Sequence, residues 1–356
     1  MPTAEQPESN HAAESAHASC AEIRRAEVRA LAQMAGASEL DVSRALSGSP
    51  GLDAGLRARV MELAQQRGFS LLIGAKKLQA RQNRTVAVVI PYQGEARQHL
   101  SDPFFLAILG SIADTLTDRG LDMLISRIDA ENLHEAALSY DTGRAVGVIL
   151  IGQWRRQDQL NLIAARRVPL VVWGAWLPGQ SYVTVCTDNF NGGFVATEHL
   201  IRMGRKRIAF LGDIELPEVK RRHDGYCKAL QQHGLPRDEQ LVIPTGYAEE
   251  GGIAAMAELK RRGVSCDALF ACSDLVAMAA IDVMRAEHKR IPQDVAVVGY
   301  DDIERARFFD PPLTTIRQHM EAAGPALVDT LLSIIDEQPA EPYQIPTQLI
   351  VRNTSV

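Results

Sequence analysis

Four aromatic residues stand beside the ends of apolar runs or in loops, where they could contact a ligand with a flat apolar face. They are Phe104, Trp173, Trp176 and Tyr247. A sugar ring presents C–H groups on its faces and hydroxyls around its rim, so aromatic rings with polar neighbours suit a carbohydrate. Each ring could instead belong to the core. Trp176 and Tyr247 flank loops that contain Pro or Gly, which favours the ligand contact.

The common catalytic and cofactor motifs are absent from the sequence. There is no G-x-S-x-G elbow, no phosphate-binding loop, no G-x-G-x-x-G after a strand and no group of His residues at metal-ligand spacing. We therefore predict a binding protein that is not an enzyme and that needs neither cofactor nor metal.

Between residues 85 and 356, apolar runs alternate with helical stretches, and this alternation must position the aromatic residues. The runs are 86–90, 121–125, 146–151, 169–173, 207–211, 268–271 and 295–299. Continuous apolar runs are typical of strands buried on both faces, and their alternation with helices favours parallel sheets. About 270 residues is long for one such sheet, so we expect two α/β lobes with a ligand crevice between them.

The head of the chain, residues 22–67, has the pattern of three short helices. The first is predicted to stop at Gly36, because glycine tolerates a left-handed backbone. Ser38 and Asp41 match the capping box S-x-x-[DE] at the start of the second helix, and Asp53 is a good N-cap for the third.

A helix, a glycine turn and a second helix form the helix-turn-helix arrangement, whose second helix enters the major groove of DNA by its N-terminal residues. In this chain those residues are Ser38, Glu39, Leu40, Ser43 and Arg44. The guanidinium of Arg44 can donate two hydrogen bonds to a guanine edge. Glu39 could accept from a cytosine amino group or could be neutral surface. A small helical bundle for partner contact would show the same pattern.

The net charge of −6 is unevenly distributed. Residues 21–84 hold 11 Lys and Arg against 6 Asp and Glu, a net charge of +5, whereas residues 1–20 carry −3 and residues 85–356 carry −8. A basic head on an acidic body indicates that the head meets a polyanion such as DNA. Chance variation of surface charge is the alternative.

The cysteines and the lack of a targeting signal predict the cellular compartment of the protein. Five cysteines are scattered without a C-x-x-C pair, the first twenty residues do not resemble a targeting signal, and no run of eighteen apolar residues appears. We expect a cytoplasmic protein with reduced thiols and no membrane contact.

Several short motifs, in order over residues 27–320, resemble the lactose-repressor (LacI/GalR) family. In the head they are Ala35-Gly36-Ala37-Ser38 and the segment from Val42 to Gly48. In the core they are Ser101 to Phe105, Asp188 to Gly204, Asp274 to Ala277, Val298 to Asp302 and Pro311 to Ile316. Each motif is short, and their order along the chain makes the resemblance specific.

The resemblance implies a dimeric DNA-binding repressor whose core is similar to periplasmic sugar-binding proteins. We accordingly divide the chain into a disordered tail (1–20), a helix-turn-helix DNA-binding domain (21–69), a hinge (70–84) and a two-lobed effector-binding and dimerisation core (85–356). In the family a hinge helix folds on operator DNA. Leu78 matches the leucine of that helix that enters the minor groove.

The same resemblance supplies candidate effector contacts in the crevice. Arg222 matches the family's effector arginine, Asp274 and Asp301 lie at strand ends, and Ser273 stands where the family usually has Asn. With the four aromatic residues, they are the predicted contacts of a mono- or disaccharide. We predict a repressor of carbohydrate-use genes that this sugar controls.

Some positions depart from the family pattern and leave another function open. Glu27 and Asp41 are unusual in the head, and Leu71-Leu72 replaces Pro-Asn at the hinge. The alternative is a cytosolic sugar or metabolite sensor with a degenerate DNA-binding head, and a sugar-modifying enzyme is more distant. The chain ends soon after its last apolar run, 348–351, without a leucine heptad, so we expect a homodimer.

Overall fold

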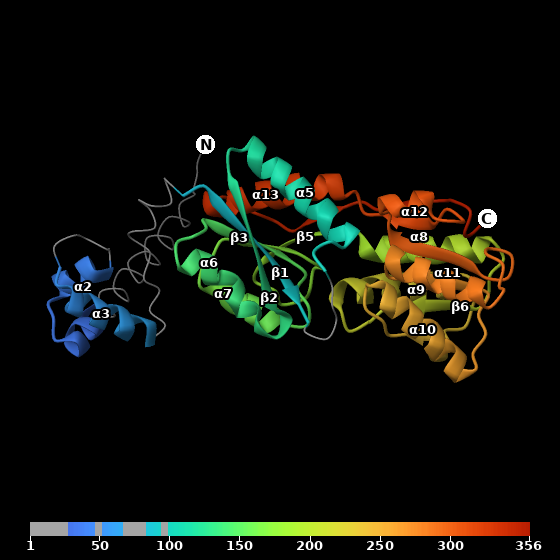
Figure 1. The fold of residues 1–356 in the computed structure, drawn as a ribbon, viewed down its shortest axis with the longest axis horizontal. Helices are drawn as coiled ribbons and strands as arrows, with labels where there is room; N and C mark the ends of the chain where they lie inside the picture. Colours follow the sequence, from blue (N-terminus) through green and yellow to red (C-terminus); the bar gives the residue numbers. More distant parts are fainter. Residues whose placement is uncertain (1–27, 47–51, 67–82, 94–98) are drawn as a thin grey trace, which may run out of the picture. The chain divides into compact units, whose positions relative to one another are not determined.

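A computed structural model of the protein describes residues 28–46, 52–66, 83–93 and 99–356 (Figure 1). The chain divides into two compact units, Met1–Asn83 and Arg84–Val356. The predicted tail over residues 1–20, most of the predicted hinge over 70–84, and Leu78 lie outside the described residues.

In the first unit, a helix over residues 28–35 precedes α2 (Glu39–Leu46) and α3 (Ala54–Gln66). Gly36 ends the first helix with a left-handed φ of 62°. The backbone N–H of Asp41 donates to Ser38 Oγ at 3.0 Å, and the N–H of Leu56 donates to Asp53 Oδ1 at 2.8 Å. Both predicted N-caps are thus confirmed. Buried residues from the three helices form one small core: Leu31, Ala32, Ala35, Val42, Ala45, Val60 and Ala64.

The described residues of the second unit form two six-stranded sheets, one in each lobe. The first sheet has the order β11-β5-β4-β3-β1-β2, and its paired strands all run parallel. The strands are β1 (Thr85–Tyr92), β2 (Asp122–Asp129), β3 (Gly147–Ile151), β4 (Leu170–Trp173), β5 (Val183–Thr187) and β11 (Tyr343–Ile345).

The second sheet has the order β12-β10-β9-β8-β6-β7. Its strands are β6 (Ile208–Leu211), β7 (Val242–Ile243), β8 (Ala268–Ala271), β9 (Ala296–Asp301), β10 (Thr314–Arg317) and β12 (Gln348–Ile350). The pairing of β10 with β12 is antiparallel, and the other pairings are parallel. Two lobes with largely parallel sheets were predicted and are confirmed. The seven runs correspond to β1, β2, β3, β4, β6, β8 and β9, and they missed β5, β7, β10 and β11. The last apolar run, 348–351, contains β12.

Helices cover both faces of the first sheet. On one face α5 (Pro103–Asp118) and α13 (Met320–Ile335) pack on Val86, Val88 and Ile90 of β1. On the other face the 3-10 helix η1 (Ala130–Ala137) and α7 (Gln157–Ala165) pack on Ala87 and Val89. Alternate residues of β1 therefore serve the two cores, as the period of a strand requires. The short α6 (Leu138–Asp141) follows η1.

The second lobe has one continuous core around its sheet. Its helices are α8 (Asn189–Arg202), α9 (Pro217–Gln232), α10 (Glu249–Arg262), α11 (Asp274–Ala286) and α12 (Glu304–Phe308), with the 3-10 helix η2 (Glu239–Leu241). Figure 1 shows these helices around β6 and its neighbours. Among the described residues, no helix is both long and apolar enough to cross a membrane.

Within residues 99–356 the chain passes between the lobes three times. The passages join β5 to α8, β10 to α13 and β11 to β12. The C-terminal segment thus contributes a strand to each sheet. Two of these connecting segments begin at the ends of β5 and β10. Residues in the connecting segments therefore lie where the two lobes meet.

Candidate functional site

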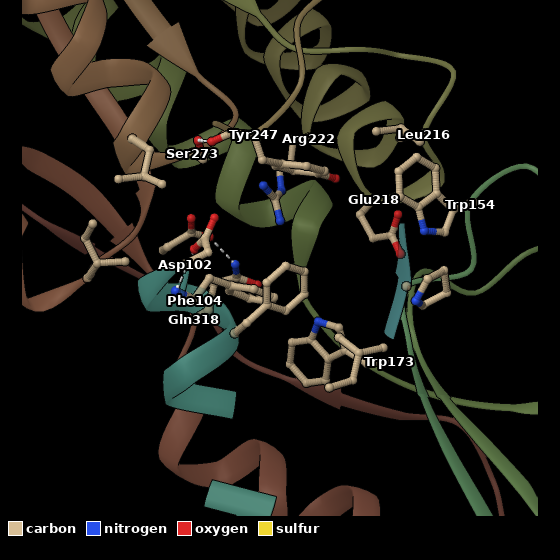
Figure 2. A pocket seen from close by; sticks show the side chains of 17 residues that line it. Asp102, Phe104, Trp154, Trp173, Leu216, Glu218, Arg222, Tyr247, Ser273 and Gln318 are labelled. Carbon is tan, nitrogen blue, oxygen red and sulfur yellow. Dashed lines mark hydrogen bonds between the residues drawn. The ribbon is translucent and has the colours of Figure 1, made fainter. Parts of the chain in front are cut away.

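A pocket opens between the two lobes, with about 800 Å³ of empty space that includes its opening to solvent (Figure 2). Six of the eight predicted contacts line it: Phe104, Trp173, Arg222, Tyr247, Ser273 and Asp301. Phe104 of α5 and Trp173 of β4 belong to the first lobe. In the second lobe, Arg222 lies on α9, Asp301 ends β9, Ser273 caps α11, and Tyr247 lies in the loop between β7 and α10. The side chains lie around the ends of the strands, as expected for parallel α/β sheets.

Arg222, on α9, is held by contacts that leave little freedom. Its side chain is buried, and its Nε donates to Asn189 Oδ1 at 2.8 Å. A second nitrogen donates to the carbonyl of Cys272, and the guanidinium lies 3.7 Å from the centre of the Tyr300 ring. These contacts orient the guanidinium before any ligand arrives, which lowers the entropic cost of binding.

Asp301 ends β9 with an unusual backbone. Its φ is 120°, a region that L-residues rarely adopt and that is often found at functional sites. Its Oδ1 accepts from Gln318 Nε2 at 2.5 Å. Burial raises the pKa of Asp301 to about 7, although Arg222 acts in the opposite direction. The carboxyl is therefore held partly desolvated at the pocket wall, where a ligand hydroxyl can bond to it.

Ser273 lines the pocket, but its hydroxyl is already occupied. It donates to the carbonyl of Tyr247 at 2.7 Å and accepts from the N–H of Val276 at 3.2 Å, as the N-cap of α11. The serine thereby fixes the backbone of Tyr247, whose ring also lines the pocket. The predicted aromatic wall is formed by Phe104, Trp173 and Tyr247.

Two predicted contacts lie outside the pocket lining, and the assignment of Asp274 is corrected. Asp274 is fully buried and turned into the second lobe, where it accepts from the N–H of Ile303 at 2.9 Å and from Thr315 Oγ1. Its carboxylate therefore holds the loop after β9 in place. Trp176 is 56% exposed and is not among the residues that line the pocket.

Several lining residues were not predicted, among them Asp102, Trp154, Glu218 and Gln318. Asp102 caps α5 by accepting from the N–H of Phe104 at 2.9 Å. Trp154 follows the apolar run of β3, so the rule that selected Trp173 would have found it. Glu218 precedes Arg222 by four residues, which places both on one helix face. Gln318 shows no pattern in the sequence that indicates its role.

The predicted DNA-reading residues run from Ser38, just before α2, to Arg44 in the last turn of α2. Leu40 is 59% exposed, the side chain of Arg44 is 56% exposed, and Ser43 is exposed. The hydroxyl of Ser38 donates to Asp41 Oδ2 at 2.7 Å as part of the cap. Glu39 forms an ion pair of 3.0 Å with Arg29. The exposed face of α2 thus presents an apolar, a hydroxyl and a cationic side chain.

Comparison with known proteins gives matches over both the core and the whole chain. Residues 197–355 match the family model described as periplasmic binding protein-like domain. The HTH-type transcriptional regulator CelR of Thermobifida fusca is 33% identical over 338 residues, 93% of this chain and 98% of the relative. The HTH-type transcriptional repressor PurR of Haemophilus influenzae is 27% identical over 92% of this chain and 98% of the relative.

Solved structures agree with these relatives. A transcriptional regulator CelR-cellobiose complex superposes with a TM-score of 0.69 at 31% identity, over 92% of this chain and 99% of the other. A LacI family regulator from Enterococcus faecium with bound ribose gives a TM-score of 0.66 at 26% identity, over 76% of this chain and 98% of the other. The sequence motifs, the two-lobed fold and the match along nearly the whole chain agree: the chain belongs to the LacI/GalR family of transcriptional regulators.

Proposed function

We propose that this protein is a cytoplasmic, homodimeric repressor that binds a specific operator and is released from it, or held on it, by a small sugar in the pocket. The observation that carries the proposal is the pairing of Arg222 and Asp301 with three aromatic rings in one cleft. Family membership supplies the regulatory role, and the cellobiose and ribose in the related structures favour a sugar.

The chemistry of the pocket suits hydroxyl groups. The guanidinium of Arg222 donates hydrogen bonds, and the carboxyl of Asp301 accepts them. Phe104, Trp173 and Tyr247 offer rings against which the C–H faces of a sugar can pack. No covalent chemistry is needed, and we infer that the protein binds its ligand without turning it over.

For the head, we propose that residues 21–69 bind DNA and that 70–84 form the hinge. The exposed face of α2 carries Leu40, Ser43 and Arg44, and the whole segment from 21 to 84 has a net charge of +5. One such head contacts few base pairs, so two heads of a dimer reading a two-fold symmetric operator are expected.

The test has two parts, one that measures ligand binding and one that measures DNA binding. Calorimetry of the full protein with cellobiose, ribose, a nucleobase and a sugar phosphate should show binding of a neutral sugar only. Selection from random DNA, followed by gel shift, should return a palindromic site whose binding changes with that sugar. Sugar binding without any selected DNA would favour the sensor with a degenerate head. Binding of only a nucleobase or a phosphorylated metabolite would refute the carbohydrate assignment.

A further inference from the structure

The turn after β9 holds two consecutive residues in the left-handed region of the backbone. Asp301 has a φ of 120° and Asp302 has a φ of 57°. Residues other than glycine adopt this region at a cost in free energy, so the surrounding structure must hold such a turn in place. Asp301 and Ile303 line the pocket, whereas Asp302 between them does not. The conformation of this turn therefore sets the direction of the Asp301 carboxyl.

The side chain of Asp302 is held between two arginines from other segments of the chain. Only 5% of this side chain is exposed. Its Oδ2 accepts from Arg317 Nε at 2.7 Å, and its Oδ1 accepts from Arg352 Nη2 at 2.6 Å. Each carboxylate oxygen thus has its own charged donor, and hydrogen bonds between ionised groups are stronger than those between neutral groups. A change in the backbone at Asp302 would break both bonds.

The two arginines lie in segments that are themselves fixed. Arg317 ends β10 and lies opposite Asp301 in the sheet. Arg352 follows β12, and its side chain is 14% exposed. Nη1 of Arg352 donates to the carbonyl of Leu313 at 2.7 Å, and the backbone N–H of Arg352 donates to Thr314 Oγ1 at 2.8 Å. The two ion pairs therefore attach the turn to β10 and to the segment after β12.

The neighbours of Asp302 are held by other groups. The N–H of Ile303 donates to Asp274 Oδ2 at 2.9 Å, and Gln318 Nε2 donates to Asp301 Oδ1 at 2.5 Å. The bond from Gln318 acts on the side chain of Asp301, so it cannot fix the backbone of the turn. The ion pairs of Asp302 act on the backbone, because they hold the residue that directly follows Asp301.

We propose that Asp302, held by Arg317 and Arg352, is a positioning residue that keeps the backbone of Asp301 in its left-handed conformation and so directs the Asp301 carboxyl into the pocket. This inference rests on the proposed function, in which Asp301 binds a hydroxyl of the effector. Asp302 itself does not contact the ligand. When its ion pairs are lost, the turn relaxes and saccharide affinity falls, although every group that contacts the saccharide is still present.

The experiment measures saccharide binding by calorimetry on the full protein. The probe is the tightest binder of a panel of neutral saccharides that includes cellobiose. Asp302→Asn keeps the shape of the side chain and tolerates a positive φ but lacks the charge, and Arg352→Gln removes one charged donor. Each should weaken binding at least fivefold. Glu304→Gln, an exposed carboxyl two residues further on, is the matched control and should leave binding unchanged.

Asp302→Gly separates the side chain of Asp302 from its backbone preference. Glycine adopts a positive φ without steric cost, so this variant keeps the turn accessible and removes only the ion pairs. We expect it to weaken saccharide binding at least fivefold, as Asp302→Asn does. Circular dichroism confirms that each variant is folded at the temperature of the measurement. Parental affinity in both Asp302→Gly and Asp302→Asn would overturn the proposal.

A double-mutant cycle tests whether Asp302 acts through Asp301. Asp302→Asn should weaken binding at least fivefold in the parent but less than twofold in Asp301→Ala, because the carboxyl that it positions is already gone. Equal losses in both backgrounds would show a general effect on the fold and would overturn the proposal, while the proposed function would stand. Failure of every saccharide to bind the parent would overturn the proposed function itself.

Discussion

The hydroxyl of Thr187 donates a hydrogen bond of 2.7 Å to the side-chain oxygen of Gln318, and both residues are buried. Thr187 ends β5 and Gln318 follows β10, so this bond joins two of the passages between the lobes. The side-chain nitrogen of the same Gln318 donates to Asp301. One amide therefore links the wall of the pocket to the segments about which the lobes would move.

Replacing Gln318 should affect both stability and ligand binding. Gln318→Ala leaves the buried hydroxyl of Thr187 and the carboxyl of Asp301 without this partner, so we expect a loss of about 1–3 kcal/mol in the free energy of unfolding. Saccharide affinity should fall as well, because Asp301 is no longer oriented. Urea unfolding and calorimetry measure the two effects. The exposed Gln344→Ala on β11 is the control and should change the unfolding free energy by less than about 0.5 kcal/mol.

Arg222 is expected to control the response to the sugar without affecting DNA binding. Arg222→Ala should weaken saccharide binding at least about tenfold, since it removes a charged donor from a buried site, a loss of about 1.5–3 kcal/mol. Operator affinity without sugar should stay at the parental level, and the sugar should no longer change it. Gel shifts with and without the saccharide test this.

The neighbouring Arg221 is a matched control for that variant. Its side chain is 50% exposed and lies 3.9 Å from Asp224, on the surface of α9. Arg221→Ala should bind saccharide and operator like the parent. An Arg222→Ala protein that still responds fully to the sugar would contradict the assignment of this arginine.

The raised pKa of Asp301 predicts a dependence of stability on pH. Burial raises this pKa from 3.8 to about 7 in the folded protein. Between about pH 4 and pH 7 the folded state therefore holds a proton that the unfolded chain has lost, and stability falls as pH rises through this window. Asp301→Asn removes this titration. The free energy of unfolding of the variant minus that of the parent should therefore increase by more than about 1 kcal/mol between pH 4 and pH 7.

Urea unfolding of both proteins at several pH values between 4 and 8 checks this. Burial also raises the pKa of Glu218 and of Asp274. The contribution of Glu218 largely cancels in the difference. The charge of Asp301 also raises the pKa of Asp274, so the difference reports the titration of these two carboxyls together. A difference in stability that does not change between pH 4 and pH 8 would show that Asp301 titrates normally.

Arg44 should contribute to operator choice. Arg44→Ala is expected to cost about 1–3 kcal/mol of operator affinity and to relax the preference at one base pair in each half-site. Arg59 of α3 is an exposed arginine in the same unit and serves as the control. Selection from random DNA with each variant measures the preference. An Arg44→Ala protein that selects the parental operator with parental affinity would exclude direct base contact.

The sequence by itself determined the elements and much of the pocket. Apolar runs predict buried strands because a strand in a parallel sheet is covered on both faces, and β1 fits this with Val88 in one core and Val89 in the other. The caps at Ser38 and Asp53 depend only on residues three positions away. Phe104 and Trp173 were located because strand ends and helix starts converge in this fold, and Arg222 was located by its match to the family's effector arginine.

Only the tertiary structure decided which polar side chains face the pocket. Asp274 and Asp301 both stand beside strand ends, yet Asp274 turns inward because Thr315 and the N–H of Ile303 bind its carboxylate. Such contacts join residues far apart along the chain, whereas local patterns report only whether a position is buried. The direction of a buried polar side chain is determined by the partners that the fold brings to it.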